Sequence, residues 1–282
     1  MNEEAVSIPE PPVAPPPPRP YPRFWQAFRL LLTLAVLQIA LFLVVRIAGA
    51  TRGDPAVGAC VELLAYGIVF RRGLRRTAAP ASDVFPLRAF RPGLVIATVL
   101  TFAGFGLLIL EVGYLFNKAL PKPESFRAIE RESDIGVFGP LRSVLMAPIL
   151  EELLNRGLIL RGFLGAYSRP RAVFLSALLF GLFHLNPWQI LPAFGAGLLL
   201  GWWRVGTGSL WPCIAGHMLW NGLIAAGRAF LPPPPHPLPE FPVSDQLMTV
   251  GFGVILLGTG LLLWRRSATR GTPLPAGGAA PI

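Results

Sequence analysis

The chain's apolar residues fall into eight long runs separated by short polar segments. These runs cover residues roughly 25–48, 54–70, 93–116, 139–160, 170–186, 188–203, 209–230 and 245–264. A straight helix needs about 20 apolar residues to cross a bilayer, and shorter runs can still cross where neighbouring helices cover them. The pattern therefore predicts an all-α, polytopic transmembrane helical bundle with about eight spans.

Both ends of the chain have compositions that do not support a packed core. Residues 1–23 contain a Pro-rich stretch that favours an extended polyproline II conformation. Residues 267–282 are rich in Gly, Pro, Ala and Thr. We expect two disordered tails around a transmembrane domain of residues 24–266. The acidic, Pro-rich start lacks the pattern of a signal peptide, so the first apolar run is interpreted as a retained span.

The composition supports the same class. Only 14% of the 282 residues are charged and 53% are hydrophobic, whereas proteins on average contain about 25% charged residues. The net charge of +10 comes largely from basic residues that flank the apolar runs, as in residues 71–76. Membrane proteins fix their topology in this way. We therefore expect no nucleic-acid partner, and a multi-pass protein of the cell membrane with both termini in the cytoplasm.

Polar residues concentrate in the second half of the chain, inside apolar runs, where ionisable groups are costly unless they pair or do chemistry. The fourth run contains Glu151, Glu152, Asn155 and Arg156. Glu152 and Arg156 have the i,i+4 spacing and the acid-before-base order that favour an ion pair. Glu151 has no basic residue at that spacing, so it is a candidate general base, and Asn155 lies on its face of the helix. The alternative is that both glutamates are structural.

Two of the chain's three histidines lie in later runs. His184 lies near the end of the fifth run, where a single histidine is more often structural than catalytic. His217 and Asn221 lie in the seventh run at i,i+4, so they point to one side of a helix. They are either hydrogen-bond donors for a reaction or a polar clamp between helices. The other charged residues that stand alone in apolar runs receive no role; they are Arg46, Glu62 and Glu111.

Three ordered motifs resemble those of the CPBP family, which contains type II CAAX prenyl proteases and bacteriocin-processing or self-immunity proteins (also called the abortive infection, or ABI, family). They are Glu151-Glu152-xxx-Arg156, Phe180-xxx-His184 and His217-xxx-Asn221. The resemblance covers residues 139–225, which we expect to form the catalytic core. One position departs from the family, which usually has a large apolar residue before the motif arginine, where this chain has Asn155.

The resemblance implies an intramembrane endopeptidase that hydrolyses peptide bonds of a membrane-associated peptide or protein in the lipid bilayer. Carried over by motif position, Glu151 would activate a water molecule for attack on the scissile carbonyl. His184 would position and polarise that water, and His217 and Asn221 would stabilise the oxyanion.

The resemblance assigns structural support to Glu152 and Arg156, which would hold the helix geometry. Asn155 could hydrogen-bond Glu151, and it would then tune the base or mark an inactive member. A catalytically silent bacteriocin self-immunity or interaction protein of the same fold is therefore the alternative function. A transporter with a proton-relay carboxylate ranks last, because the chain shows no internal repeat.

The sequence does not decide whether the predicted peptidase uses a metal. Members of the family have often been described as metalloproteases, but the HExxH zinc signature is absent from this chain. We favour a glutamate-type peptidase without a cofactor. The alternative is a metallopeptidase with zinc bound by Glu151, His184 and His217.

Overall fold

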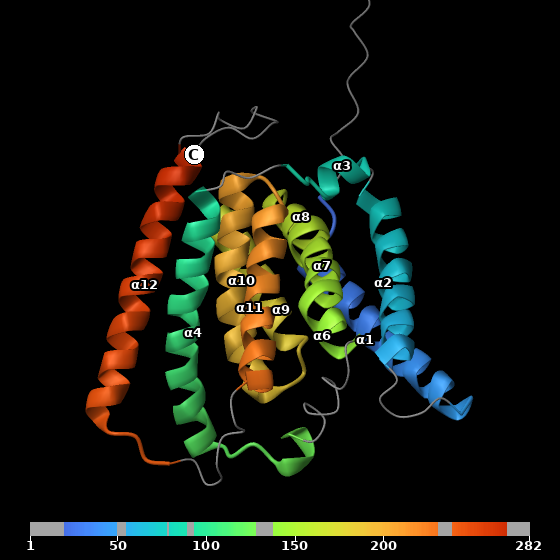
Figure 1. Ribbon diagram of the computed structural model, residues 1–282. Helices are drawn as coiled ribbons and strands as arrows, with labels where there is room; N and C mark the ends of the chain where they lie inside the picture. The colour runs from blue at the N-terminus through green and yellow to red at the C-terminus, as the bar shows by residue number, and fades with distance from the viewer. Residues whose placement is uncertain are drawn as a thin grey trace, which may run out of the picture.

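The computed structural model describes residues 20–49, 55–77, 79–88, 93–127, 138–230 and 239–269. Within these ranges all regular secondary structure is helical (Figure 1), which confirms the predicted all-α class. A short helix, α3 (Ala81–Val84), follows α2. The longer helices are α1 (Phe24–Ile47), α2 (Pro55–Thr77), α4 (Gly93–Ala119), α9 (Arg169–Leu182), α10 (Pro187–Thr207), α11 (Trp211–Phe230) and α12 (Val243–Thr269).

The fourth apolar run forms one continuous helical rod that contains two π-helical segments. It comprises α6 (Phe138–Pro140), η1 (Leu141–Met146), α7 (Ala147–Glu152), η2 (Leu153–Ile159) and α8 (Leu160–Leu164). The segments η1 and η2 are π-helical, a geometry that is rare and frequently occurs at functional sites. The α-helical stretch that carries the two adjacent glutamates therefore lies between two π-helical segments.

Three helices in the described part of the chain are long and apolar enough to cross a membrane: Phe24–Ile47, Gly93–Ala119 and Val243–Ser267. They support the predicted membrane location, but they do not confirm a count of about eight spans. Two of the other runs fall short for physical reasons. Helix α2 ends in a group of arginines, and α9 has only 14 residues, or about 21 Å at 1.5 Å per residue.

Helices α4 and α12 pack side by side along one edge of the molecule (Figure 1). Glycines permit this close approach. A Cβ atom on Gly104 would overlap the main chain of α12 at Leu257, and one on Gly260 would lie 2.6 Å from the main-chain nitrogen of Thr101. Small residues allow membrane helices to pack closely where apolar lipid supplies no hydrophobic driving force. The α4–α12 pair therefore depends on these glycines.

The motif-bearing helices occupy the middle of the bundle. Helices α7, α9 and α11 lie between the α4–α12 pair on one side and the α1–α2 pair on the other (Figure 1). Buried apolar side chains form one cluster that includes Leu158 and Phe163, and a second that includes Phe102 and Trp203. The polar residues of the motifs are thus held by packed elements on both sides.

Arginines near the ends of several helices gather at one end of the bundle. The ends of α2, α8, α10 and α12 lie at the top of Figure 1, and each of these four helices has an arginine in its last turn. Helix α12 continues to Thr269, three residues into the predicted C-terminal tail. Residues 1–19 and 270–282, which make up most of the two predicted tails, lie outside the described residues.

Candidate active site

The predicted ion pair of the fourth run is present. The Arg156 Nη1 atom lies 2.8 Å from Oε1 of Glu152, and both side chains are completely buried. Arg156 is on η2, one turn after Glu152, so the pair closes across the junction of α7 with the π-helical segment. Two charges without access to water are tolerated because each is the other's partner.

Further contacts surround the buried guanidinium. The Cζ atom of Arg156 lies 4.3 Å from the ring centroid of Phe180 on α9. Its Nη2 atom donates to the main-chain oxygen of Gly197 on α10, at 3.4 Å. A cation over an aromatic face is stabilised by the ring quadrupole. Arg156 therefore links the motif helix to both α9 and α10.

His217 on α11 lies between the two glutamates. Its Nδ1 atom is 2.9 Å from Oε1 of Glu152, the same oxygen that accepts from Arg156. Its Nε2 atom is 3.9 Å from Oε2 of Glu151. The ring is almost entirely buried and meets the ring of Phe180 edge to face, with the centroids 5.7 Å apart. Glu152 thus does more than the predicted bracing of its helix, since it also orients His217.

Glu151 differs from its neighbour in having no close cationic partner. Its side chain is 24% exposed, and its Oε2 atom is buried without a hydrogen bond to any described residue. The distance of 3.9 Å to His217 Nε2 is too long for a direct hydrogen bond. Both atoms are therefore available to a further polar partner, such as a water molecule that binds next to them. The geometry suits a carboxylate that would act on a small molecule bound beside it and His217.

Asn155, which departs from the family pattern, does not bond the carboxylate of Glu151. Its Nδ2 atom donates to the main-chain oxygen of Glu151 at 2.9 Å. Its own main-chain oxygen accepts from Ser176 on α9 at 3.4 Å. The side chain is buried. Asn155 is therefore part of the helix packing, and the side chain of Glu151 is left without it.

His184 lies in the turn between α9 and α10 rather than inside a helix. Its Nδ1 atom is 2.7 Å from the main-chain oxygen of Phe180, and its ring meets the ring of Phe180 edge to face at 4.8 Å. The turn is shaped by Leu185, with a φ of 53°, and by Asn186, whose side chain accepts from the Trp188 N–H of α10. His184 thus reaches the other motif residues through Phe180.

The side-chain amide of Asn221 bonds the motif rod at η1 rather than at the glutamates. Its Nδ2 atom donates to the main-chain oxygen of Ser143 in η1, at 2.8 Å. One turn earlier on the same helix, His217 bonds Glu152. The two residues therefore do act from one side of α11, but they hold different parts of the motif rod. This bond is the polar clamp between helices that the sequence left open as an alternative.

The sequence motifs predicted no role for Phe180, which lies at the centre of the site. Its ring contacts Arg156, His217 and His184, and its main-chain oxygen also bonds His184. Only the four-residue spacing to His184 hinted at its importance. The contacts of Phe180 with η2 and α11 depend on the fold and leave no local signal in the sequence.

A second ion pair lies beside the motif rod. Arg142 on η1 and Glu62 on α2 are joined at 2.8 Å, with Glu62 7% and Arg142 40% exposed. Glu62 was left without a role from the sequence. Its partner is 80 residues away in the chain, so no local spacing could have revealed the pair.

The alternative zinc site requires three side chains to meet. Among the residues that the structure describes, no three of the types His, Cys, Asp and Glu come together in a way that could hold a metal ion. Nδ1 of His184 bonds the Phe180 main-chain oxygen and Nδ1 of His217 bonds Glu152, so each ring keeps its Nε2 atom for another partner. Zinc bound by Glu151, His184 and His217 therefore stays an alternative that measurement of metal content would test.

Comparison with known proteins agrees with the motifs. Residues 134–223 match the family described as type II CAAX prenyl endopeptidase Rce1-like. No curated protein and no solved structure matches the chain. The matched range contains all three motifs and nearly coincides with the catalytic core expected at residues 139–225. The resemblance to the CPBP family is therefore confirmed for the segment that builds this site, which matches a family of type II CAAX prenyl endopeptidases.

Proposed function

We propose that this chain is a glutamate-type intramembrane endopeptidase that hydrolyses a peptide bond of a membrane-associated substrate. One observation carries the proposal: Oε2 of Glu151 and Nε2 of His217 face each other at 3.9 Å, and Glu152 holds the opposite side of the His217 ring. A base and a donor that lie this close can bind a water molecule and a carbonyl oxygen at neighbouring positions. The family match supports peptidase chemistry in general.

In the proposed reaction, Glu151 takes a proton from the water as its oxygen attacks the scissile carbonyl. The carbonyl becomes a tetrahedral oxyanion next to His217. When the intermediate collapses, the C–N bond breaks and Glu151 returns the proton to the leaving amine. Each proton transfer of this type contributes typically about 10²–10⁴ in rate. The water is consumed, and the products are a carboxylate and an amine.

The hydrogen bond to Glu152 restricts how His217 can assist. If its Nδ1–H donates to the Glu152 carboxylate, a neutral ring presents only a lone pair at Nε2. Stabilising the oxyanion requires a proton on Nε2, so His217 would act as the imidazolium. Two carboxylates are then balanced by this ring and by Arg156. Such a neutral cluster suits a site with little water.

The family resemblance assigns catalytic roles to Glu151, His184, His217 and Asn221, and the contacts do not support these roles equally. Nδ1 of His184 and Nδ2 of Asn221 are already bonded to main-chain oxygens. The second nitrogen of His184 would still be able to reach a water, whereas Asn221 would contribute by fixing η1. These engaged groups are also the observation that favours the alternative, a catalytically silent immunity or interaction protein of the same fold.

For the membrane topology we propose a multi-pass bundle of about eight spans with both termini in the cytoplasm. The arginines gathered at one end of the bundle support this orientation (Figure 1), because cytoplasmic loops carry an excess of basic residues. Cysteine labelling of each connection in intact cells would test it.

Cleavage by the purified full-length protein in detergent tests the enzymatic proposal. The substrates are membrane-tethered peptides, each offered with and without a prenylated C-terminal cysteine motif, and products are identified by mass spectrometry. Metal content is measured on the same sample, since stoichiometric zinc that supports cleavage would favour the metallopeptidase. If no peptide is cut while expression of the chain protects cells from a bacteriocin, the silent alternative replaces the proposal.

A further inference from the structure

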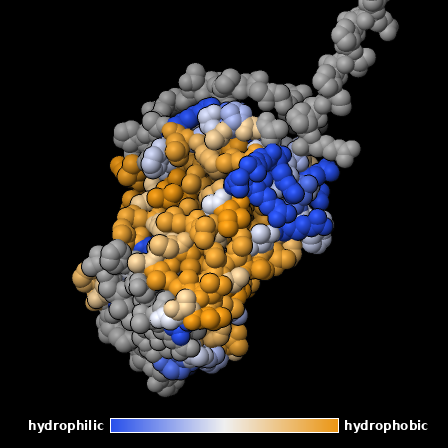
Figure 2. All heavy atoms as spheres, turned by 90° about the vertical axis from the view of Figure 1, so that its right-hand side faces the viewer, coloured by the Kyte–Doolittle hydropathy of each residue, from blue (hydrophilic) through white to orange (hydrophobic). Residues whose placement is uncertain are grey.

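A dense basic surface lies at the C-terminal end of α2. Arg71, Arg72, Arg75 and Arg76, here called the α2 arginine edge, are all exposed. Within the described part of the chain none of them has an acidic partner. Figure 2 looks onto the side formed by α1 and α2 and shows one compact hydrophilic patch at the upper margin of a largely hydrophobic face. The candidate active site uses none of these arginines.

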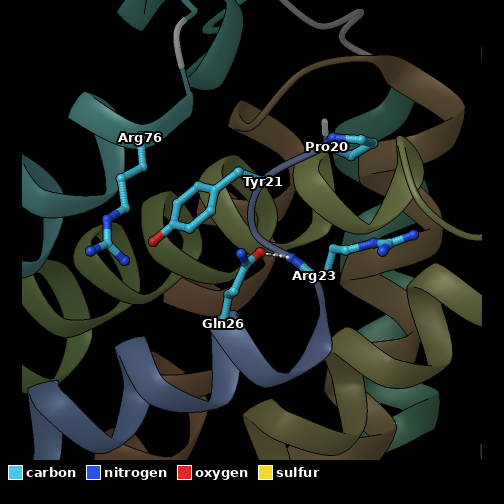
Figure 3. A pocket seen from close by; sticks show the side chains of 5 residues that line it. All are labelled: Pro20, Tyr21, Arg23, Gln26 and Arg76. Carbon is cyan, nitrogen blue, oxygen red and sulfur yellow. Dashed lines mark hydrogen bonds between the residues drawn. The ribbon is translucent and has the colours of Figure 1, made fainter. Parts of the chain in front are cut away.

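A cavity of about 450 Å³ opens beside the α2 arginine edge. It is lined by Pro20, Tyr21, Arg23, Gln26 and Arg76 (Figure 3). A second hollow of about 300 Å³ shares Arg76 and is lined further by the other three edge arginines and Ile68. Arg76 thus belongs to both hollows.

The polar groups of the larger cavity are hydrogen-bond donors. Figure 3 shows the Tyr21 hydroxyl directed between Arg76 and Gln26. This hydroxyl oxygen is buried and bonds no described residue. Gln26 uses its Oε1 atom to accept from the main-chain N–H of Arg23, so its amide N–H groups are left for a ligand. Guanidinium, amide and hydroxyl donors around one space are a receptor for an anion, and a phosphate matches the guanidinium geometry well.

The floor of this cavity is fixed by the packing of the chain before α1. Pro22 is buried against α8, where a Cβ atom on Gly162 would overlap its main chain. Pro20 lies close to Gly165 in the same way, at 3.1 Å from the position of an added Cβ. This packing fixes the segment of chain that carries Tyr21 and leads into Gln26, so two of the donors are held in place before a ligand binds.

Apolar surface continues from the arginines along α2. Ile68, which lines the smaller hollow, is 42% exposed, and Leu64, one turn earlier, is 53% exposed. On the adjacent helix α1, exposed apolar side chains include Val36 and Ile39. A ligand with a phosphate in the cavity would therefore find a lipid-facing apolar surface next to it. This combination fits a phospholipid better than a free phosphate.

We propose that the cavity between the start of α1 and the end of α2 is a binding site for the headgroup of an anionic phospholipid. The phosphate accepts hydrogen bonds from Arg76, the Tyr21 hydroxyl and the Gln26 amide, while the acyl chains lie on α2. The remaining edge arginines add to the positive potential that attracts an anionic headgroup. Basic residues near a membrane surface each attract anionic lipid by about 1 kcal/mol, which corresponds to about a fivefold change in affinity.

Native mass spectrometry of the full-length protein in detergent tests the site. The probes are phosphatidylglycerol, phosphatidylcholine and inorganic phosphate, and the variants are Arg76→Gln and Tyr21→Phe. Arg169→Gln is the matched control, because Arg169 is an exposed arginine at the start of α9 and lines neither hollow. We expect phosphatidylglycerol to be retained in preference to phosphatidylcholine, with retention at least fivefold weaker in Arg76→Gln, weaker in Tyr21→Phe and unchanged in Arg169→Gln.

Three outcomes would overturn the proposal. Equal losses in Arg76→Gln and Arg169→Gln would show a diffuse attraction of charge without a site. Inorganic phosphate that displaces phosphatidylglycerol at equal concentration would show a free-phosphate site. Equal retention of phosphatidylcholine and phosphatidylglycerol would show that the headgroup charge is not recognised. Unfolding midpoints of all variants are compared, and if Arg76→Gln unfolds early, the Tyr21→Phe result decides.

Discussion

Replacing Glu152 with Gln tests the buried charge cluster at its most connected atom. Oε1 of Glu152 accepts from Nη1 of Arg156 at 2.8 Å and lies 2.9 Å from Nδ1 of His217. Glutamine has the same size but no charge, so the guanidinium of Arg156, which is completely buried, would keep its charge without a counter-ion. Removing one partner of such a pair typically costs about 3–5 kcal/mol. We expect Glu152→Gln to lower the free energy of unfolding by that amount.

Denaturation of the purified protein by increasing fractions of SDS in mild detergent, followed by tryptophan fluorescence, measures this change. Glu62→Gln is the matched control, since Glu62 pairs at the same 2.8 Å with an arginine that is 40% exposed. Arg142 can turn to water, so the control should lose less stability. The double variant of Glu152→Gln and Arg156→Met should recover part of the loss, because no uncompensated charge remains. A loss below about 1 kcal/mol in Glu152→Gln, or a larger loss in the control, would refute the reasoning.

Three further predictions concern packing and the motif residues. Gly104→Val should lower the unfolding free energy by about 1–3 kcal/mol, because its side chain would meet the main chain of α12 at Leu257; an unchanged SDS midpoint would contradict the close α4–α12 contact. Asn221→Ala should cost about 1 kcal/mol of stability through the lost bond to Ser143 and should change the cleavage rate less than tenfold, whereas a loss of 10² or more would make it an oxyanion donor. His217→Gln should lower the cleavage rate by about 10²–10³ in assays with the tethered peptides, and near-normal turnover would remove His217 from the reaction.

The sequence predicted the helical class and the residues of the motif rod because both depend on local spacing. Eight apolar runs indicated helices, and the i,i+4 spacing of Glu152 and Arg156 predicted their contact. The number of membrane spans was less predictable. Run lengths alone did not reveal that the fourth run would contain two π-helical segments.

Contacts between helices explain most of what the sequence did not predict about the site. His217 and Asn221 share a helix face, yet one bonds a glutamate on α7 and the other a main-chain oxygen on η1. The position of Phe180 between Arg156, His217 and His184 depends on how α9 packs. Glu62 and Arg142 pair across 80 residues. None of these contacts follows from residue spacing along one element, so only the assembled bundle reveals them.

The central claim is that Glu151, and not its buried neighbour, is the base that activates water. The most direct measurement is the cleavage rate of Glu151→Gln on the tethered peptide that the wild-type protein cuts, with the SDS unfolding midpoint recorded in parallel. Oε2 of Glu151 bonds no described residue and the side chain is 24% exposed, so we expect little change in stability. The rate should fall at least about 10²-fold. Cleavage within tenfold of wild type by a stable Glu151→Gln protein would contradict the account.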